Sequence, residues 1–159
     1  MNSFGWDRFE KQQATEREQL RQLLAGIQPL LAQCRNVVPN AIELSALAAM
    51  LHSFYTGIEN IFKRVTVELD GERVHGDAWH RELLLRMKLP GTHRPALLSS
   101  ELHDELLEFL RFRHVFRHAY SFDLDWQKMS PLVLKAEETL RQFESALDIF
   151  VRQAGEQNE

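Results

Sequence analysis

The 159-residue sequence lacks the cysteines that would cross-link a fold and the long apolar run that would span a membrane. Its single cysteine excludes an intramolecular disulfide and a cysteine-based zinc site, and it favours a reducing compartment, which we expect to be the cytoplasm. No stretch approaches the roughly 18 consecutive apolar residues of a membrane span, and the N-terminal region is too polar for a secretory signal. A net charge of −4 excludes a general attraction to nucleic acid.

Glycine and proline are also few, at seven and five residues, and leucine is abundant, which is a helix-forming composition. Apolar residues recur at spacings of three and four, as on one face of a helix. They predict helices over residues 6–34, 40–67, 78–87, 100–120 and 125–153. We expect an all-α fold, an antiparallel bundle of about five helices in one domain over 1–159, with an N-terminal helix (1–38), a core (40–153) and a polar tail (154–159).

Turn and cap residues mark the ends of these helices. The spacing favours N-caps at Asp77, at Ser99 or Ser100, and at Asp125 or Ser130. Residues 65–69 and 73–75 have a second interpretation as a short β-hairpin, because Asp70 and Gly71 form a turn dipeptide between them.

Three residues interrupt the apolar face of the second predicted helix, and one cysteine lies on that of the first. Gly57 indicates either a close approach of two helices, including one across a dimer interface, or a tolerated defect. Glu59 and Asn60 either face solvent or support the basic segment described next. Cys34 lies on the apolar face of the first helix, where we expect a small buried residue.

The fourth helix ends in a basic segment, residues 111–120, which holds three arginines, two histidines and a tyrosine but no acidic residue. Cleavage of RNA by its own 2′-hydroxyl needs a base, an acid and a cation that stabilises the phosphate. Histidine suits both proton transfers, and arginine binds two phosphate oxygens at once. On an ideal helix His118 points about 140° away from Arg113, so the two converge only if the helix ends near His118.

Two other interpretations of the basic segment stay open. Basic residues in the last turns of a helix are favourable there without any function. His114 and His118 have the i, i+4 spacing of two metal ligands, but the neighbouring arginines would repel a divalent cation. We therefore predict no metal site and no cofactor. The remaining histidines form no recognisable ligand spacing: His52, His75, His80, His93 and His103.

Arg113, His118 and Tyr120 reproduce the Arg-x4-His-x-Tyr pattern of the HepT toxins, a branch of the HEPN superfamily. Residues 47–62 also resemble the long core helix of HepT-like proteins, and residues 79–87 resemble a further segment of them. The resemblance covers about residues 40–150. The chain departs from the compact HepT form in its N-terminal helix and in an insertion between Leu69 and Pro95.

The resemblance implies a helical homodimer in which two copies of the motif form one composite site. It implies metal-independent cleavage of RNA that leaves a 2′,3′-cyclic phosphate, with Arg113 binding and polarising the phosphate and His118 transferring protons. We expect His114, Arg117 and Arg111 to support RNA binding. Tyr120 matches the tyrosine to which a cognate minimal nucleotidyltransferase (MNT) antitoxin adds AMP. The sequence therefore predicts the endoribonuclease toxin of a type VII-like toxin–antitoxin pair, with no membrane partner.

Two further functions are compatible with the same residues. One is a non-catalytic HEPN scaffold that dimerises and binds a nucleotidyltransferase, which needs only the apolar stripes and polar helix faces. The other is a nucleic-acid binder without catalysis, whose binding through the basic segment would weaken steeply with salt.

Overall fold

The computed structural model describes residues 3–117, 120 and 123–158, and His118 lies outside them. Within these residues the chain forms helices and no β-strand, so the all-α prediction is confirmed. The elements are five α-helices and one π-helix: α1 (Ser3–Gln33), α2 (Ala41–Arg64), η1 (Val65–Asp70), α3 (Trp79–Arg86), α4 (Ser100–Phe116) and α5 (Trp126–Gln157).

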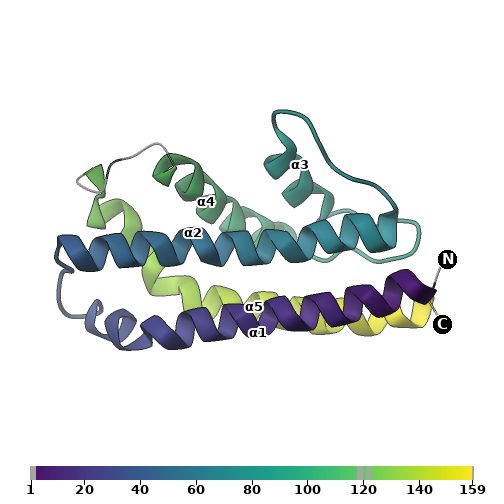
Figure 1. Ribbon diagram of the computed structural model, residues 1–159, viewed down its shortest axis with the longest axis horizontal. Coiled ribbons are helices and arrows are strands. Elements are labelled where there is room, and N and C mark those ends of the chain that lie inside the picture. The colour runs from purple at the N-terminus through teal and green to yellow at the C-terminus, as the bar shows by residue number, and fades with distance from the viewer. Residues whose placement is uncertain (1–2, 118–119, 121–122, 159) are drawn as a thin grey trace.

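The helices form a bundle around α2 (Figure 1). α1 and α2 run antiparallel along the long axis, and α5 crosses behind α2 before it runs beside α1. α3 and α4 lie on the side of α2 that faces away from α1, and both ends of the chain lie at the same end of the bundle. This arrangement leaves α2 in contact with every other helix.

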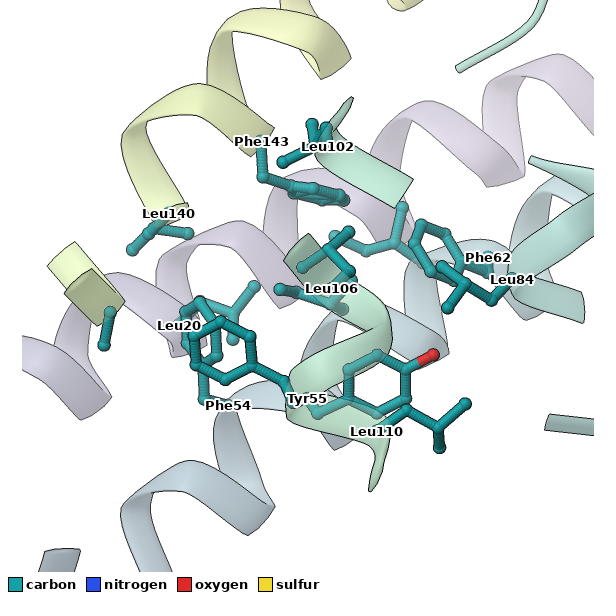
Figure 2. Packing of buried hydrophobic residues seen from close by; sticks show 14 of the residues in the cluster. Leu20, Phe54, Tyr55, Phe62, Leu84, Leu102, Leu106, Leu110, Leu140 and Phe143 are labelled. Carbon is teal, nitrogen blue, oxygen red and sulfur yellow. The ribbon is translucent and has the colours of Figure 1, made fainter. Parts of the chain in front are cut away.

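The apolar stripe of α2 forms the centre of the core (Figure 2). Phe54 packs on Phe109 of α4 with ring centroids 5.1 Å apart, and Phe62 packs edge-on against Phe143 of α5. Burial of each ring stabilises the fold by about 1.5–3 kcal/mol. By length and composition alone, the stretch Ala41–Asp70 is apolar enough to cross a membrane, and its place at the centre of the bundle accounts for that composition.

Gly57 of α2 faces the side chain of Leu20 on α1. A methyl group at Gly57 would lie 2.6 Å from Leu20 Cδ2, which is far inside van der Waals contact. The interpretation of Gly57 as a site of close helix approach is confirmed, and the approach is between two helices of one chain. Cys34 is buried as expected, and burial, together with the nearby Glu43 carboxylate, raises the pKa of its thiol.

Two of the predicted N-caps are confirmed. The Ser99 hydroxyl accepts a hydrogen bond from the backbone N–H of Leu102, and the Asp125 carboxylate accepts one from the N–H of Gln127. Asp77 was a wrong prediction, because α3 begins one residue later, with Ala78 at its N-cap position and no side-chain cap.

The β-hairpin interpretation of residues 65–75 is wrong. α2 passes directly into η1, which ends at Gly71 with a φ of 69°, a conformation that glycine adopts without strain. The carboxylate of Asp70, the last residue of η1, accepts hydrogen bonds from Arg94 at 2.8 and 2.9 Å. A tertiary ion pair thus holds the end of this helix, and no local signal in residues 65–70 reports it.

The last helix is longer than predicted. α5 continues to Gln157 rather than ending near Gln153, so most of the predicted polar tail is helical. Ala154 is fully buried, and Gly155 packs on the ring of Trp6 from the start of α1. Packing between the two ends of the chain extends the helix where the sequence composition favoured a tail.

Candidate active site

A basic pocket of about 480 Å³ lies between α4 and the start of α3. Four arginines and two histidines line it, together with one acidic residue, Asp77, among the described lining residues. The basic members are His80 and Arg81 of α3, Arg111, Arg113 and His114 of α4, and Arg117 at its C-cap. The pocket therefore concentrates positive charge in a chain whose net charge is −4.

Arg113 forms the buried wall of the basic pocket. Its two terminal nitrogens bind the two carboxylate oxygens of Glu59 at 3.2 Å each, and Nη1 also donates to the hydroxyl of Thr56 at 3.2 Å. Its guanidinium carbon lies 4.9 Å from the centre of the Tyr55 ring. These three partners lie on α2, one turn apart, so the packing of α4 on α2 fixes the arginine in place.

Glu59 binds Arg113, whereas the sequence had left open whether Glu59 faces solvent or supports the basic segment. It is 2 % exposed, and its carboxylate supports the basic segment rather than facing solvent. The neighbouring Asn60 points elsewhere, because its side-chain amide donates to Glu16 of α1 at 3.4 Å. Of the two polar exceptions on α2, only Glu59 belongs to the site.

His80 completes this cluster from α3, and the sequence did not identify it. Its Nδ1 lies 2.8 Å from Glu59 Oε2 and 2.6 Å from Arg113 Nη2. The ring lies beside that of Trp79, with centroids 3.5 Å apart and planes tilted by 31°, and 26 % of the side chain remains exposed. His80 is 21 positions from Glu59 and 33 from Arg113, so no sequence spacing could join them.

Exposed cations surround the mouth of the basic pocket. Arg111 forms an ion pair with Glu108 at 2.7 Å, and both side chains are about half exposed. His114 and Arg117 are also exposed. The structure thus brings Arg111, Arg113, His114 and Arg117 to one pocket, as a shared binding role requires, and that role stays a prediction.

The rest of the sequence motif lies beyond the end of α4. The helix ends at Phe116 with Arg117 as its C-cap, which meets the condition that it end before His118. His118 itself is not among the described residues, so its proximity to Arg113 stays a prediction. Tyr120 is 71 % exposed, which leaves its ring accessible from solvent.

Two side chains of α2 report the electrostatic environment of Arg113. Burial lowers the pKa of His52, and the positive charges of Arg113 and Arg117 lower it further. Burial raises the pKa of Tyr55, with a smaller contribution from Glu59 in the same direction. The Tyr55 hydroxyl has no hydrogen-bond partner among the described residues.

The described part of the chain provides no set of side chains that could hold a metal ion. No three or more His, Cys, Asp or Glu side chains there are grouped to hold a metal ion. The pocket is instead suited to anions, because its accessible polar groups are mainly guanidinium and imidazole.

Comparison with known proteins gives a match to the model of a protein family. The model of the family described as HepT-like protein matches residues 46–154, which include the whole pocket and the motif from Arg113 to Tyr120. This agrees with the extent of the resemblance expected from the sequence. No curated protein and no solved structure matches the chain.

Proposed function

The chain belongs to the HepT-like family of the HEPN superfamily, and on that premise we propose that it is a metal-independent endoribonuclease, the toxin of a toxin–antitoxin pair. The observation that carries the proposal is the basic pocket, in which Arg113 is fixed beside Arg111, His114 and Arg117. A phosphodiester is the ligand class that such a set of guanidinium groups binds best.

The buried position of Arg113 refines its role in cleavage. Both of its terminal nitrogens already bind Glu59, so it acts as a fixed positive charge in the pocket wall that polarises the phosphate. The exposed Arg111 and Arg117 supply direct contacts to the RNA backbone. His118 transfers protons at the scissile phosphate, and two chains contribute their pockets to one composite site.

Tyr120 provides the means of neutralisation. Its exposure allows a nucleotidyltransferase to add AMP to the hydroxyl. We propose that this AMP group lies beside the pocket, where its negative charge would repel the RNA phosphate and its bulk would block the phosphate's place. The partners of the protein are then its RNA substrate and a minimal nucleotidyltransferase antitoxin in the cytoplasm.

The first test is cleavage of a mixed RNA substrate in excess chelator. Wild-type protein, with intact mass showing no adduct on Tyr120, is compared with His118→Ala. We expect cleavage by the wild type alone, with products that end in 2′,3′-cyclic phosphate. Cleavage that requires a divalent cation would contradict the mechanism, and equal cleavage by both proteins would exclude His118 from it.

One observation favours a second candidate, a non-catalytic scaffold that binds a nucleotidyltransferase. The Arg113–Glu59 ion pair is buried, and such a pair has a structural role without any chemistry. A scaffold would bind the nucleotidyltransferase tightly and would leave RNA intact at every protein concentration. The assay above separates the two functions, because only the nuclease gives products.

A further inference from the structure

The ring nitrogen Nδ1 of His80 faces two partners that it cannot satisfy together. Glu59 Oε2 at 2.8 Å is an ionised carboxylate oxygen and only accepts hydrogen bonds, whereas Arg113 Nη2 at 2.6 Å only donates them. With a proton on Nδ1, His80 donates to Glu59 and its lone pair is on Nε2. With the proton on Nε2, Nδ1 accepts from Arg113. The position of one proton decides which nitrogen of His80 can act as a base.

We propose that His80 is the general base of the cleavage reaction, held by Glu59 so that Nε2 takes the proton of the ribose 2′-hydroxyl. This inference rests on the proposed endoribonuclease function. Three observations carry it: the Nδ1–Glu59 contact, the placement of the ring at the pocket that holds Arg81, Arg111 and Arg117, and the partial exposure of the side chain.

In the proposed state Nδ1–H donates to Glu59 Oε2, which gives the tautomer that a base requires. A carboxylate that accepts from Nδ1–H leaves Nε2 unprotonated and fixes the orientation of the ring, which is the arrangement of a carboxylate–histidine pair in general-base catalysis. Since Nδ1 faces two buried residues, Nε2 is the nitrogen left for a ligand in the pocket.

The charge of Arg113 argues for a base rather than an acid at this position. An acid would start as an imidazolium, whose positive charge would lie 2.6 Å from the guanidinium of Arg113. A base starts neutral and carries that charge only after it has taken the proton, when the phosphate of the transition state lies beside it. Glu59, at 2.8 Å from the same ring nitrogen, then stabilises the imidazolium that has formed.

The proposed step balances without a metal or a further reactant. His80 Nε2 removes the proton of the 2′-hydroxyl, and the 2′-oxygen forms a bond to the adjacent phosphorus. The bond from phosphorus to the 5′-oxygen breaks, and that oxygen receives a proton from the acid, His118 in the proposed function. The products are a 2′,3′-cyclic phosphate and a 5′-hydroxyl end, and His80 then releases its proton to water.

The test uses His80→Asn and two substrates. The asparagine amide still donates a hydrogen bond toward Glu59 but cannot exchange a proton, so it separates catalysis from structural support. RNA needs an acid for its leaving group, whereas uridine 3′-(4-nitrophenyl phosphate) does not, because nitrophenolate leaves unprotonated. General-base catalysis contributes about 10²–10⁴-fold. We therefore expect His80→Asn to lose at least about 100-fold on both substrates.

Each other outcome overturns the assignment. A loss of less than about threefold on both substrates leaves His80 outside the chemistry, and a loss on RNA alone makes it the acid. No cleavage of either substrate by the wild type overturns the proposed function and the role of His80 with it. The matched control is His75→Asn, which changes an exposed histidine outside this pocket and is expected to cleave both substrates as the wild type does.

A measurement on the wild-type protein covers the case in which His80→Asn fails to fold. Nitrogen NMR of the imidazole rings distinguishes a protonated from an unprotonated ring nitrogen at neutral pH. We expect His80 to carry its proton on Nδ1. A proton on Nε2 would show that Nδ1 accepts from Arg113, and His80 could not then be the base.

Discussion

Two arginines, Arg94 and Arg113, are buried in this bundle, and each binds both oxygens of one carboxylate. Arg94 pairs with Asp70 at the end of η1, and Arg113 pairs with Glu59 in the middle of α2. Both pairs are bidentate and alike in charge, although Arg94 binds through Nε and Nη2 and Arg113 through its two terminal nitrogens. They differ in what the arginine contacts besides its carboxylate.

The remaining contacts of Arg94 are with backbone. Its Nη1 donates to the carbonyl oxygens of Leu89 at 2.8 Å and Pro95 at 3.2 Å, so the pair ties the loop after α3 to the end of η1. These carbonyl acceptors neither titrate nor exchange protons. Arg94 and Asp70 therefore form a structural clamp.

The remaining contacts of Arg113 are with side chains that carry chemistry. Its guanidinium contacts Thr56, the Tyr55 ring and Nδ1 of His80, and it forms one wall of the basic pocket. The comparison teaches that burial of an arginine–carboxylate pair does not itself indicate function. The third partner distinguishes a clamp from a site.

Removal of either carboxylate is expected to have the largest effect. Glu59→Ala and Asp70→Ala each leave a buried guanidinium without its counter-ion, and we expect each to lower the free energy of unfolding by about 3–5 kcal/mol. Urea denaturation measures this directly. Glu108→Ala removes the carboxylate of the exposed pair with Arg111 and is the control, with an expected cost of about 0–1 kcal/mol. A cost for Glu59→Ala close to that of the control would contradict the buried pair.

Lysine at each arginine separates the clamp from the site. Lysine keeps the charge but loses the planar fork that binds two oxygens. We expect Arg113→Lys to cleave RNA about 100-fold more slowly, because without the two bonds to Glu59 its positive charge is no longer fixed at the pocket wall. Arg94→Lys should unfold at a lower temperature and cleave at the wild-type rate while folded. Equal rates for Arg113→Lys and the wild type would make both pairs structural.

Tyr55→Phe tests whether the buried hydroxyl of Tyr55 lowers the stability of the fold. The hydroxyl is buried without a partner among the described residues, whereas the ring contacts Arg113. Phenylalanine keeps the ring and removes the cost of the buried oxygen, so the free energy of unfolding should rise by about 1 kcal/mol. Tyr55→Leu removes the ring as well and should lower it. A marked loss of stability in Tyr55→Phe would mean that the hydroxyl has an essential partner.

His52 is expected to give the smallest effect, seen as a dependence of stability on pH. Its pKa in the folded protein is lowered from the ordinary value near 6.5, so on acidification the unfolded chain binds this proton first. The contribution of His52 to stability is therefore complete well above pH 6.5 and is lost as the pH falls through 6.5 toward the folded pKa. We expect His52→Gln to lose less stability than the wild type between pH 7 and 5, by chemical denaturation at both values. His75→Gln, at an exposed histidine, should behave as the wild type does.

The sequence predicted more of the fold than of the site. The helices, the caps at Ser99 and Asp125, and the close approach at Gly57 were predictable because each rests on local chemistry or on a repeat of three and four residues. The π-helix after α2 was not, because Arg94, 24 positions away, holds its last residue. The extension of α5 depends likewise on Trp6, at the other end of the chain.

The residues of the site also divide into one that the sequence predicted and others that it did not. Arg113 was predictable from the motif, and the family match includes it. Glu59 was visible only as a polar residue on an apolar stripe, and His80 gave no signal at all. A helical period shows which face of a helix is buried, but it carries no information on which residue of another helix that face will meet.

The sequence by itself determined that this protein is a helical bundle with a basic segment at the end of its fourth helix, because helix formation and charge clustering are properties of neighbouring residues. Only the tertiary structure decided that Glu59, His80 and Arg113 meet. They come from α2, α3 and α4, and the packing of α3 and α4 on α2 closes the 54 positions between Glu59 and Arg113. In this largely buried cluster, the position of one proton on His80 decides which of its ring nitrogens can accept another.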